Sequence, residues 1–338
     1  MDNAILPSAN NENRSVLSLE SMTSSKLTVN NNGGLTVTHY LNLDGTIDLE
    51  GESQLIQSDG SVLKVGVDGT TENDQQGTAD KFTYNYWSSP VGSNTTTATN
   101  ATYESSYSVP DVMMDGSNPS SPTAINFLTS GYNGTNTTPI GIADYWIWKF
   151  ANQSDGDYSS WQHVRSTGTL LPGEGFTMKG PGTGSISTPQ NYVFKGKPNN
   201  GTITLPISAN NDYLVGNPYP SAIDANEFLN DNPSLGGTLY FWEHWGGGSH
   251  VLAEYQGGYA LYNFSGGVPT ASYGTNDPDV ATGGTPTKLP GRYIPVSQGF
   301  FVYSATGGSV TFENDQRVFV KEGATSTFFR TSSDAQSS

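Results

Sequence analysis

The chain has 338 residues, of which 34% are hydrophobic, 11% are aromatic and only 13% are charged. Ordinary globular domains carry about 25% charged residues. Here the polarity comes from Asn, Thr, Ser and Gly instead, and the chain has 40 Gly, 19 Pro and no Cys. This composition is typical of a turn-rich, all-β, extracellular protein that forms its core without disulfides. The aromatic content excludes intrinsic disorder.

The net charge is -17, from 14 basic and 31 acidic residues. Such a surface repels phosphate groups, which excludes nucleic acids and anionic membranes as partners. No run of 18 apolar residues occurs, so we expect no membrane span. Met1 is followed by a polar sequence without the basic and apolar regions of a signal peptide. We therefore expect an excised fragment, or a mature form with an added Met.

The first three predicted segments precede any recognisable repeat. Residues 1–25 are polar and lack periodicity, which predicts a loose lead-in. In residues 26–66 apolar residues alternate in short runs, separated by pairs such as Asp44-Gly45 and Asp59-Gly60. This pattern predicts short strands joined by tight turns, either as rungs of a β-solenoid or as a meander. Residues 67–80, "VDGTTENDQQGTAD", are predicted to be a polar linker.

After residue 80 a different sequence pattern occurs twice, which predicts an internal duplication. We assign residues 81–205 and 206–325 to two related β-sandwich-like units, with a tail at 326–338. The landmarks recur in the same order: a strand that ends in a proline turn ("NYWSSP" and "YLVGNP"), an aromatic strand (Trp148 and Trp242), a Gly-Phe strand (Gly175-Phe176 and Gly299-Phe300) and a closing strand (Phe194 and Phe312).

The stretch "NDYLVGNPYPSAIDANEFLND" (211–231) opens the second unit. Its apolar run predicts a core strand, and Pro218 and Pro220 keep the residues before them extended. Ser221, followed three residues later by Asp224, predicts the start of a short helix, which Asn232-Pro233 ends. We interpret the stretch as a folding element.

Two polar insertions, at 93–138 and 263–291, are longer than most loops of compact β-domains. Loops of this length are usually functional. The repeat does not explain Trp161 and Trp245, which are therefore candidate surface groups for stacking on a sugar. Tyr132 and Tyr273, one in each insertion, complete the set of candidate ligand-binding residues. Trp148 and Trp242 occupy matching places in the repeat and are assigned to the core.

Several segments together resemble a recurring module of large surface and secreted proteins of the phylum Bacteroidota, mainly flavobacteria. They are "YNYWSSPVG", "LLPGEGFTMKGPG", "YVFKGKPNNGTI", "YLVGNPYPSAIDANEFL", "LYFWEH" and "IPVSQGFFV". The resemblance covers roughly residues 27–325. It implies export by the type IX secretion system and adhesin-like function, and it supplies no catalytic residues. Such proteins usually finish in a C-terminal sorting domain, whereas this chain stops at "RTSSDAQSS".

Calcium is the cation that the acidic loops favour, because it prefers hard oxygen ligands. Neither loop completes a recognised calcium-binding motif, and both are also compatible with solvated turns whose carboxylates bond to their own backbone. The candidate ligands are Asp155 and Asp157 in "NQSDGDYSS", and Asp277 and Asp279 in "NDPDV".

Zinc and enzymatic chemistry have weaker support. His244, His250 and Glu254 could reach one zinc ion only if a hairpin brought them together, and their spacing matches no helical zinc motif. The chain has neither a cysteine nor a Gly-x-Ser-x-Gly nucleophile motif. We therefore expect no catalytic residues and no cofactor, calcium aside.

The sequence as a whole predicts a non-catalytic extracellular segment of a bacterial cell-surface or secreted protein. Its expected role is adhesion, or structural display of other modules of a longer chain, with a glycan or a protein surface as partner. The alternative is a carbohydrate-binding module that accompanies a secreted polysaccharide-degrading enzyme. A purely structural stalk is a third interpretation.

Overall fold

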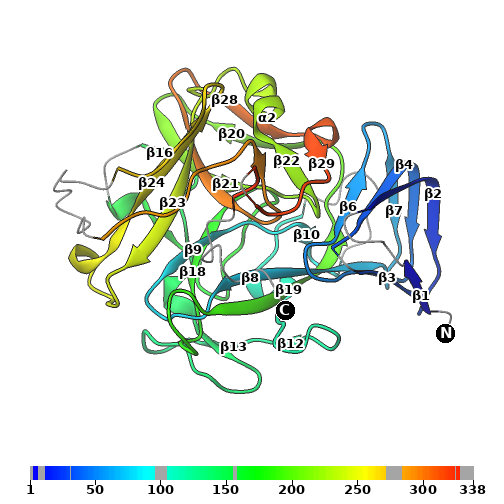
Figure 1. Ribbon diagram of the computed structural model, residues 1–338, viewed down its shortest axis with the longest axis horizontal. Coiled ribbons are helices and arrows are strands. Elements are labelled where there is room, and N and C mark those ends of the chain that lie inside the picture. The colour runs from blue at the N-terminus through cyan, green and yellow to red at the C-terminus, as the bar shows by residue number, and fades with distance from the viewer. Residues whose placement is uncertain are drawn as a thin grey trace.

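In the computed structural model, the structure describes residues 3–6, 12–30, 32–95, 105–154, 158–271, 284–323 and 325–327. Strands dominate this part of the chain, which has only two short α-helices, α1 (Val109–Val112) and α2 (Ala225–Asp231). The all-β prediction is therefore confirmed. None of the helices in the described ranges is long and apolar enough to cross a membrane. Figure 1 shows a stack of strands from the N-terminal part beside a body that the rest of the chain forms.

The N-terminal stack is a β-solenoid, because its neighbouring strands pair in parallel, whereas a meander pairs antiparallel. One wall consists of β1 (Asn3–Leu6), β3 (Lys26–Val29), β5 (Thr46–Leu49) and β8 (Thr70–Thr78). The other consists of β2 (Asn13–Ser21), β4 (Gly34–Leu43), β6 (Gln54–Gln57) and β7 (Val62–Val65). Ten buried aliphatic side chains fill the space between the walls, among them Leu35, Val37 and Ile47.

The predicted loose lead-in at 1–25 is wrong, because this segment supplies β1 and β2. Its own sequence is too polar to bury a face, and most of β2 is exposed. The strand forms because β4 offers it a parallel partner from Asn13 opposite Gly34 onward. Val16 and Leu19 also pack against the solenoid core. β2 therefore forms because it pairs with β4, which follows it in the sequence, and its own residues show no periodicity that would predict a strand.

The predicted linker at 67–80 is also wrong, because most of it is β8. This strand pairs with β5 on one side and with β19 (Pro189–Pro198) on the other. Most of its side chains are buried although they are polar, and they form hydrogen bonds. Asn73 Nδ2 donates to the Phe194 carbonyl at 3.1 Å, and Gln76 Nε2 donates to Asn191 Oδ1 at 2.9 Å. One sheet therefore continues from the solenoid into the next part of the chain (Figure 1).

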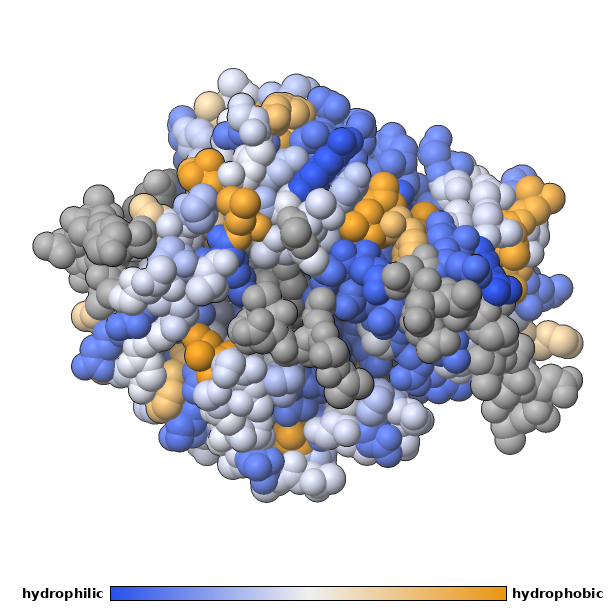
Figure 2. Space-filling view, viewed as in Figure 1, coloured by the Kyte–Doolittle hydropathy of each residue, from blue (hydrophilic) through white to orange (hydrophobic). Residues whose placement is uncertain are grey.

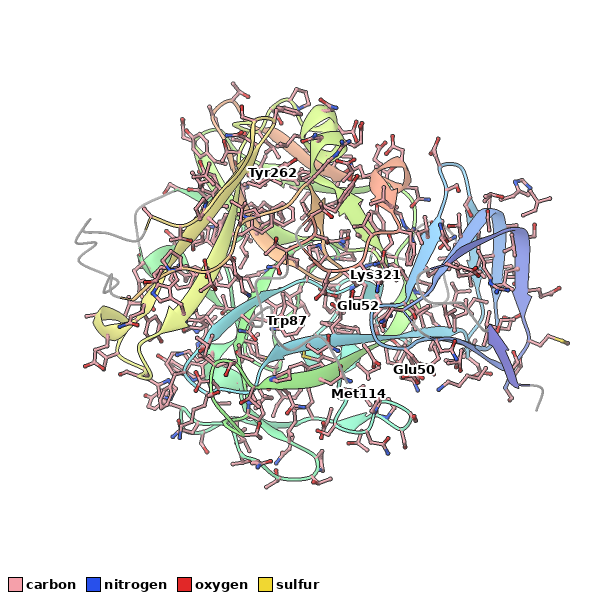
Figure 3. The ribbon with its side chains drawn as sticks, in the orientation of Figure 1. Glu50, Glu52, Trp87, Met114, Tyr262 and Lys321 are labelled. Atoms are coloured by element: carbon pink, nitrogen blue, oxygen red, sulfur yellow. The ribbon has the colours of Figure 1, made fainter. Side chains whose placement is uncertain are left out.

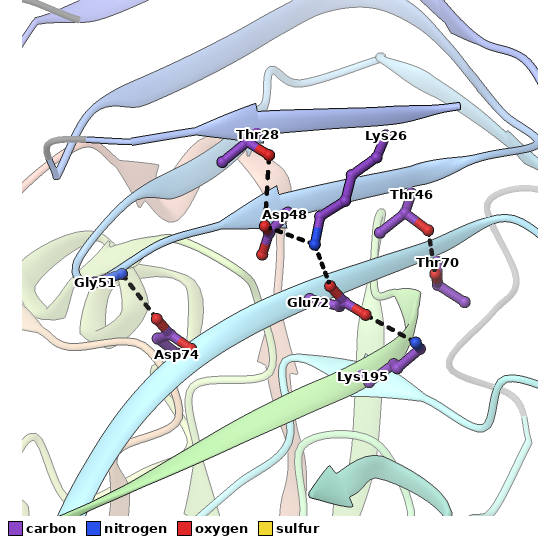
Figure 4. Close-up of polar contacts among 9 residues, drawn as sticks. All are labelled: Lys26, Thr28, Thr46, Asp48, Gly51, Thr70, Glu72, Asp74 and Lys195. Carbon is purple, nitrogen blue, oxygen red and sulfur yellow. Dashed lines mark hydrogen bonds and ion pairs between the residues drawn. The ribbon is translucent and has the colours of Figure 1, made fainter. Parts of the chain in front are cut away.

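A ladder of charges crosses the solenoid wall (Figure 4). Lys26 Nζ lies 2.9 Å from Asp48 Oδ2 and 3.1 Å from Glu72 Oε2, on the next two rungs. Lys195 Nζ approaches the other oxygen of Glu72 at 2.7 Å. Because the acids are largely buried, these pairs are less screened than surface pairs and help to fix the register of the parallel strands.

In the part of the chain that the structure describes, Glu50 forms no ion pair like those of Glu72. Burial and the carboxylates of Asp48 and Asp74 raise the pKa of Glu50 to about 7. The folded chain therefore binds this proton more tightly than the unfolded chain does. Its contribution to stability is fully present below about pH 4.5 and is lost as the pH rises through about 7. We expect Glu50→Gln to raise the melting temperature at pH 8 and to leave it unchanged at pH 4.5. Calorimetric scans of both proteins across this range test it, and a pH-independent difference would contradict it.

The two predicted units share a three-stranded arrangement with a central Gly-Phe strand. In unit 1 (81–205) the sheet order is β17 (Gln162–His163), β15 (Trp148–Lys149), β18 (Phe176–Lys179), β9 (Tyr84–Trp87). In unit 2 (206–325) it is β16 (Gln153–Ser154), β21 (Asn211–Gly216), β27 (Gly299–Ser304), β23 (Leu239–Gly246), β24 (Gln256–Asn263), β25 (Gly266–Val268). Strand β16, from the first half of the chain, thus completes the sheet of unit 2.

The remaining strands are short and close the two cores. They are β10 (Val91–Gly92), β11 (Met113–Asp115), β12 (Thr123–Ala124), β13 (Asn126–Leu128), β14 (Gly141–Ala143), β20 (Ile203–Ile207), β22 (Ala222–Asp224), β26 (Tyr293–Ile294), β28 (Gly308–Phe312) and β29 (Arg317–Val318). The closing strands differ between the units. Phe194 lies on β19, which pairs with the solenoid, whereas Phe312 lies on β28, which pairs with β20.

The stretch 211–231 is a folding element, but its helix starts later than predicted. Ser221 is not the N-cap: residues 222–224 form β22, and the Asp224 side chain accepts the backbone N–H of Asn226 at the start of α2. Asp224 also pairs with Arg292, at 2.7 Å. The carboxylate therefore caps the helix more effectively than the serine three residues earlier could. Helix α2 ends at Asp231, directly before Asn232.

The strand registers show how the units correspond. Phe176 faces Trp87 and Thr177 faces Trp148 in unit 1, while Phe300 faces Val215 and Phe301 faces Tyr240 in unit 2. By this register Trp148 matches Tyr240, and Phe150 matches Trp242. The sequence-based pairing of Trp148 with Trp242 is therefore wrong by two residues.

The units meet along a seam with approximate two-fold symmetry. Trp87 of unit 1 bridges Gln298 of unit 2, and Val215 of unit 2 bridges Glu174 of unit 1. These are corresponding pairs, as expected when one surface meets its own copy. A small cluster of buried side chains fills the seam, and it too consists of corresponding positions: Tyr86 with Leu214, and Phe150 with Trp242.

Arg317 joins the solenoid to unit 2. Its guanidinium is buried, donates to the carbonyl of Leu55 in β6 at 2.7 Å, and lies over the Tyr219 ring at 4.7 Å. Nearby, the backbone N–H of Glu322 donates to Glu52 at 2.9 Å, and the Lys321 side chain lies beside Glu52 (Figure 3). These contacts tie the C-terminal segment to the solenoid. On the face shown in Figure 2, hydrophobic residues form only small, separate patches.

Candidate binding site

An aromatic pocket lies at the seam and contains about 710 Å³ of space outside the atoms, part of it open to solvent. This size suits a small ligand or one ring of a larger ligand. Eight of its ten lining residues are tyrosine or tryptophan. Unit 1 supplies Tyr84, Tyr86, Trp148, Tyr158, Trp161 and Thr177, and unit 2 supplies Trp242, Leu252, Tyr255 and Tyr259.

Strand alternation explains why the rings converge. In "YNYW", Tyr84 and Tyr86 share one face of β9, while Trp87 lies on the other face in the core of unit 1. Trp148 lies directly opposite Thr177, so both belong to the same face of the sheet. The seam brings β23 and β24 of unit 2 against this face, and Trp242 then completes the wall.

The rings support one another and leave little freedom for rearrangement. Tyr86 stacks on Trp242 with ring centroids 6.0 Å apart, and its hydroxyl lies 3.0 Å from that of Tyr259. Trp161 packs edge-on against Tyr86 at 6.2 Å. Trp148 stacks on His163 at 3.8 Å with nearly parallel planes. The rings are therefore already ordered before a ligand arrives, which lowers the entropic cost of binding.

The exposed part of the pocket offers both ring faces and hydroxyl groups. Tyr259 is 37% exposed and Tyr158 is 63% exposed, so both reach solvent at the rim. Burial raises the pKa of the Tyr86 phenol, which therefore stays protonated and can donate. None of the ten lining side chains is a carboxylate or an ammonium. Chemically, the pocket presents stacking surfaces with a few hydroxyls, suited to a ring that has an apolar face and a polar edge.

One cation lies beside the pocket, behind its aromatic wall. Lys179 is 2% exposed, and its Nζ lies 3.7 Å from the ring centroid of Trp146 and 4.3 Å from that of Tyr84. It donates to the Tyr255 hydroxyl at 2.5 Å and to His250 Nδ1 at 3.2 Å. Burial lowers the pKa of Lys179 to about 7. Cation–π contacts of this kind offset part of the cost of burying the charge.

The structure places the four predicted ligand-binding residues differently. Trp161 is half-buried in the wall of the aromatic pocket. Trp245 is half-buried at the end of β23 and does not line the pocket. Tyr132 is 55% exposed and packs on the Tyr145 ring at 4.8 Å, and its carbonyl accepts the indole N–H of Trp146. Tyr273 lies outside the described residues.

The four calcium candidates, Asp155, Asp157, Asp277 and Asp279, also lie outside the described residues. Within the ranges that the structure does describe, no three His, Cys, Asp or Glu side chains are grouped to hold a metal.

The imidazoles of the proposed zinc set bond to protein groups instead. His244 Nδ1 accepts the Tyr84 N–H at 3.2 Å, and its Nε2 lies 2.7 Å from the Gly246 carbonyl. Burial lowers the pKa of His244 to about 4, so this imidazole is neutral at physiological pH.

Sequence reasoning missed Trp148 and Trp242 as site residues, because it assigned them to the core. Part of each indole packs against neighbouring side chains, and another part lines the pocket. The pocket lies between the units, so neither unit alone forms it. The available signal was alternation: Tyr84 and Tyr86 share a face opposite the buried Trp87. A strand with bulky aromatics on both faces requires a second partner, and here that partner is the other unit.

These features define an all-β protein with a small solenoid, two related β units and an aromatic pocket between them. Residues 114–338 match the family model described as "Domain of unknown function (DUF8693)", which covers more than half of the chain. The chain therefore belongs to this family. The comparisons with curated proteins and with solved structures each find no match. All lining residues except Tyr84 and Tyr86 fall within the matched range.

Proposed function

We propose that this chain is a non-catalytic, extracellular carbohydrate-binding segment of a bacterial surface or secreted protein. The observation that carries the proposal is the aromatic pocket, in which eight of ten lining residues are tyrosine or tryptophan. Flat aromatic side chains suit the apolar face of a sugar ring, and their hydroxyl and indole groups suit its polar edge. The low charge content and the resemblance to Bacteroidota surface modules support the extracellular location.

Two properties of the pocket favour a sugar over a purely apolar ligand. First, its wall is divided among several rings at steep angles, such as the 68° between Tyr86 and Trp161, instead of forming a closed apolar cavity. Second, the hydroxyls of Tyr86 and Tyr259 lie 3.0 Å apart, and Tyr259 is exposed at the rim, where a ligand hydroxyl can bond to it. A sugar hydroxyl can add a hydrogen bond here that a wholly hydrophobic ligand cannot make.

The pocket also supports the non-catalytic part of the proposal. Glycoside hydrolysis normally needs two carboxyl groups on opposite sides of the scissile bond, and none of the lining residues has a carboxyl group. Adhesion to a polysaccharide, or delivery of a linked enzyme to one, requires binding alone. Either role fits a pocket that holds a ligand without reacting with it.

The test is binding to a glycan array, followed by titration of each glycan that is retained. We expect Trp161→Ala to weaken binding at least tenfold, which corresponds to about 1.4 kcal/mol, because it removes one wall of the pocket. Trp245→Ala is the matched control, since this half-buried tryptophan does not line the pocket. We expect it to change affinity less than twofold.

Three outcomes would contradict the proposal. If the intact chain binds no glycan, the carbohydrate-binding function fails and a structural display role remains. If Trp245→Ala weakens binding and Trp161→Ala does not, the site lies elsewhere. If a bound glycan is cleaved, the non-catalytic assignment is wrong.

A further inference from the structure

We propose that the aromatic pocket selects acidic saccharides, of the uronic acid class, and that Lys179 is the residue that determines this specificity. The proposal rests on the carbohydrate-binding function above and names the substrate class of the same site. It follows from the position of a buried ammonium group directly behind two of the rings that line the pocket, Tyr84 and Tyr255.

Within the described residues, the Lys179 ammonium is buried without an ion-pair partner, as is that of Lys197. Other lysines with buried acid partners form ion pairs: Lys26 with Asp48, and Lys149 with Glu174 at 2.9 Å. Within the described residues, Lys179 has no carboxylate within 4.0 Å. Asp80 acts on it only at longer range, and this carboxylate already accepts the Thr83 hydroxyl at 2.7 Å.

Hydrogen-bond acceptors surround the Lys179 nitrogen. Burial and the neighbouring Lys179 ammonium lower the pKa of His250 to about 4, so its ring is neutral. Its Nε2 lies 2.9 Å from Asn133 Oδ1, an acceptor, which assigns the ring proton to Nε2. Nδ1 is then a lone-pair acceptor facing Lys179 at 3.2 Å. The Tyr255 oxygen also accepts from Lys179, at 2.5 Å. The faces of Tyr84 and Trp146 and two acceptors thus hold the cation.

This arrangement decides between the ligand classes that an aromatic pocket can accept. Cages of Tyr and Trp also bind quaternary ammonium groups, through the negative faces of the rings. Here Lys179 already occupies a face of Tyr84, 4.3 Å from its centroid, and donates to the Tyr255 hydroxyl. A second cation in the pocket would meet a like charge across a poorly screened wall, whereas an anion would meet an opposite charge. A sugar that carries a carboxylate can stack its ring on the aromatic surface and place its negative charge near the buried ammonium group.

The experiment compares ligands that differ only in charge. The probes are glucuronate, galacturonate and their oligosaccharides, each paired with its methyl ester, which keeps the ring and the linkage and removes the negative charge. Isothermal titration calorimetry measures both members of each pair. For the intact chain we expect the acid to bind at least fivefold more tightly than the ester. For Lys179→Met, which keeps the apolar stem, we expect the ratio to fall to about one.

The outcomes separate this proposal from the function on which it rests. If neutral glycans bind and uronates do not, or if acid and ester bind equally well, the acidic preference is overturned and the carbohydrate-binding function stands. If no saccharide binds, both fail. If Lys179→Met does not fold, the acid-to-ester ratio of the intact chain still decides the preference. A Lys179→Met variant that folds and keeps a fivefold ratio would contradict the role of Lys179.

Discussion

Replacing Arg317 by methionine should lower the free energy of unfolding by about 3 kcal/mol, because hydrogen bonds to a buried charged group contribute about 1.5–3 kcal/mol each. Arg317 also donates to Ser221 Oγ at 3.2 Å and to the side-chain oxygens of Asn200 and Asn314 at 3.3 and 3.1 Å. Methionine fills much of the same space but leaves these acceptors and the Leu55 carbonyl without the donor. Removal of a costly buried charge offsets part of the loss.

Burial lowers the pKa of Arg317 to about 10, so the guanidinium remains charged at pH 7 and the prediction applies at neutral pH. Urea denaturation followed by tryptophan fluorescence measures the change. Arg14→Met is the matched control, because Arg14 is 43% exposed and, among the described residues, pairs only with the exposed Glu12 at 3.3 Å. Exposed pairs contribute about 0–1 kcal/mol. Equal losses in the two variants would show that Arg317 does not anchor the solenoid to unit 2.

Alanine at Gly299 should cost about 2–3 kcal/mol, the upper part of the range for overpacking a rigid site. A Cβ at this position would lie 2.9 Å from the carbonyl carbon of Tyr86 and 3.0 Å from the Trp87 nitrogen. These are backbone atoms of β9, which pairs with β18 and cannot move alone. The corresponding Gly175 is equally close to the Val215 carbonyl oxygen, at 2.8 Å. We expect both substitutions to be destabilising, because the approximate symmetry makes their surroundings alike.

Gly236→Ala is the control for these substitutions. Gly236 is exposed, and the nearest atom to its added Cβ, in the Tyr303 ring, lies at 3.5 Å, an ordinary contact. We expect this variant to change stability by less than about 1 kcal/mol. Thermal unfolding of the three variants measures the difference. If Gly299→Ala is as stable as Gly236→Ala, the seam is looser than its backbone contacts indicate.

Much of the fold could be predicted from the sequence because its signals are local. Alternating apolar residues and X-Gly pairs identify the short strands of the solenoid, whereas the choice between solenoid and meander needed the parallel pairing of Lys26 with Thr46 and of Thr46 with Thr70. Strand β8 could not be predicted in this way. Its sequence "TTENDQQGT" has no apolar face, and it forms because β5 and β19 supply hydrogen bonds on both sides. Only the tertiary arrangement decides whether such a segment is a linker or a central strand.

The candidate site was predictable in part. Trp161 stood out because the repeat left it unexplained, and it lines the aromatic pocket. Trp148 and Trp242 seemed explained by the repeat and were assigned to the core. Lys179 carried no signal, since a lysine at the end of a strand is ordinarily exposed. The pocket arises where two units meet, and the contact between them depends on backbone approaches at Gly175 and Gly299 that no local pattern encodes.

Strand β8 also determines where the chain can be divided. A fragment cut at residue 114, where the family match begins, would lose β9 and with it Tyr84 and Tyr86. It would also leave the ten-residue strand β19 without its neighbour β8, as an open edge available to any other strand in solution. We therefore expect the matched region to aggregate when produced alone, and the smallest autonomous piece that keeps the pocket to include the solenoid.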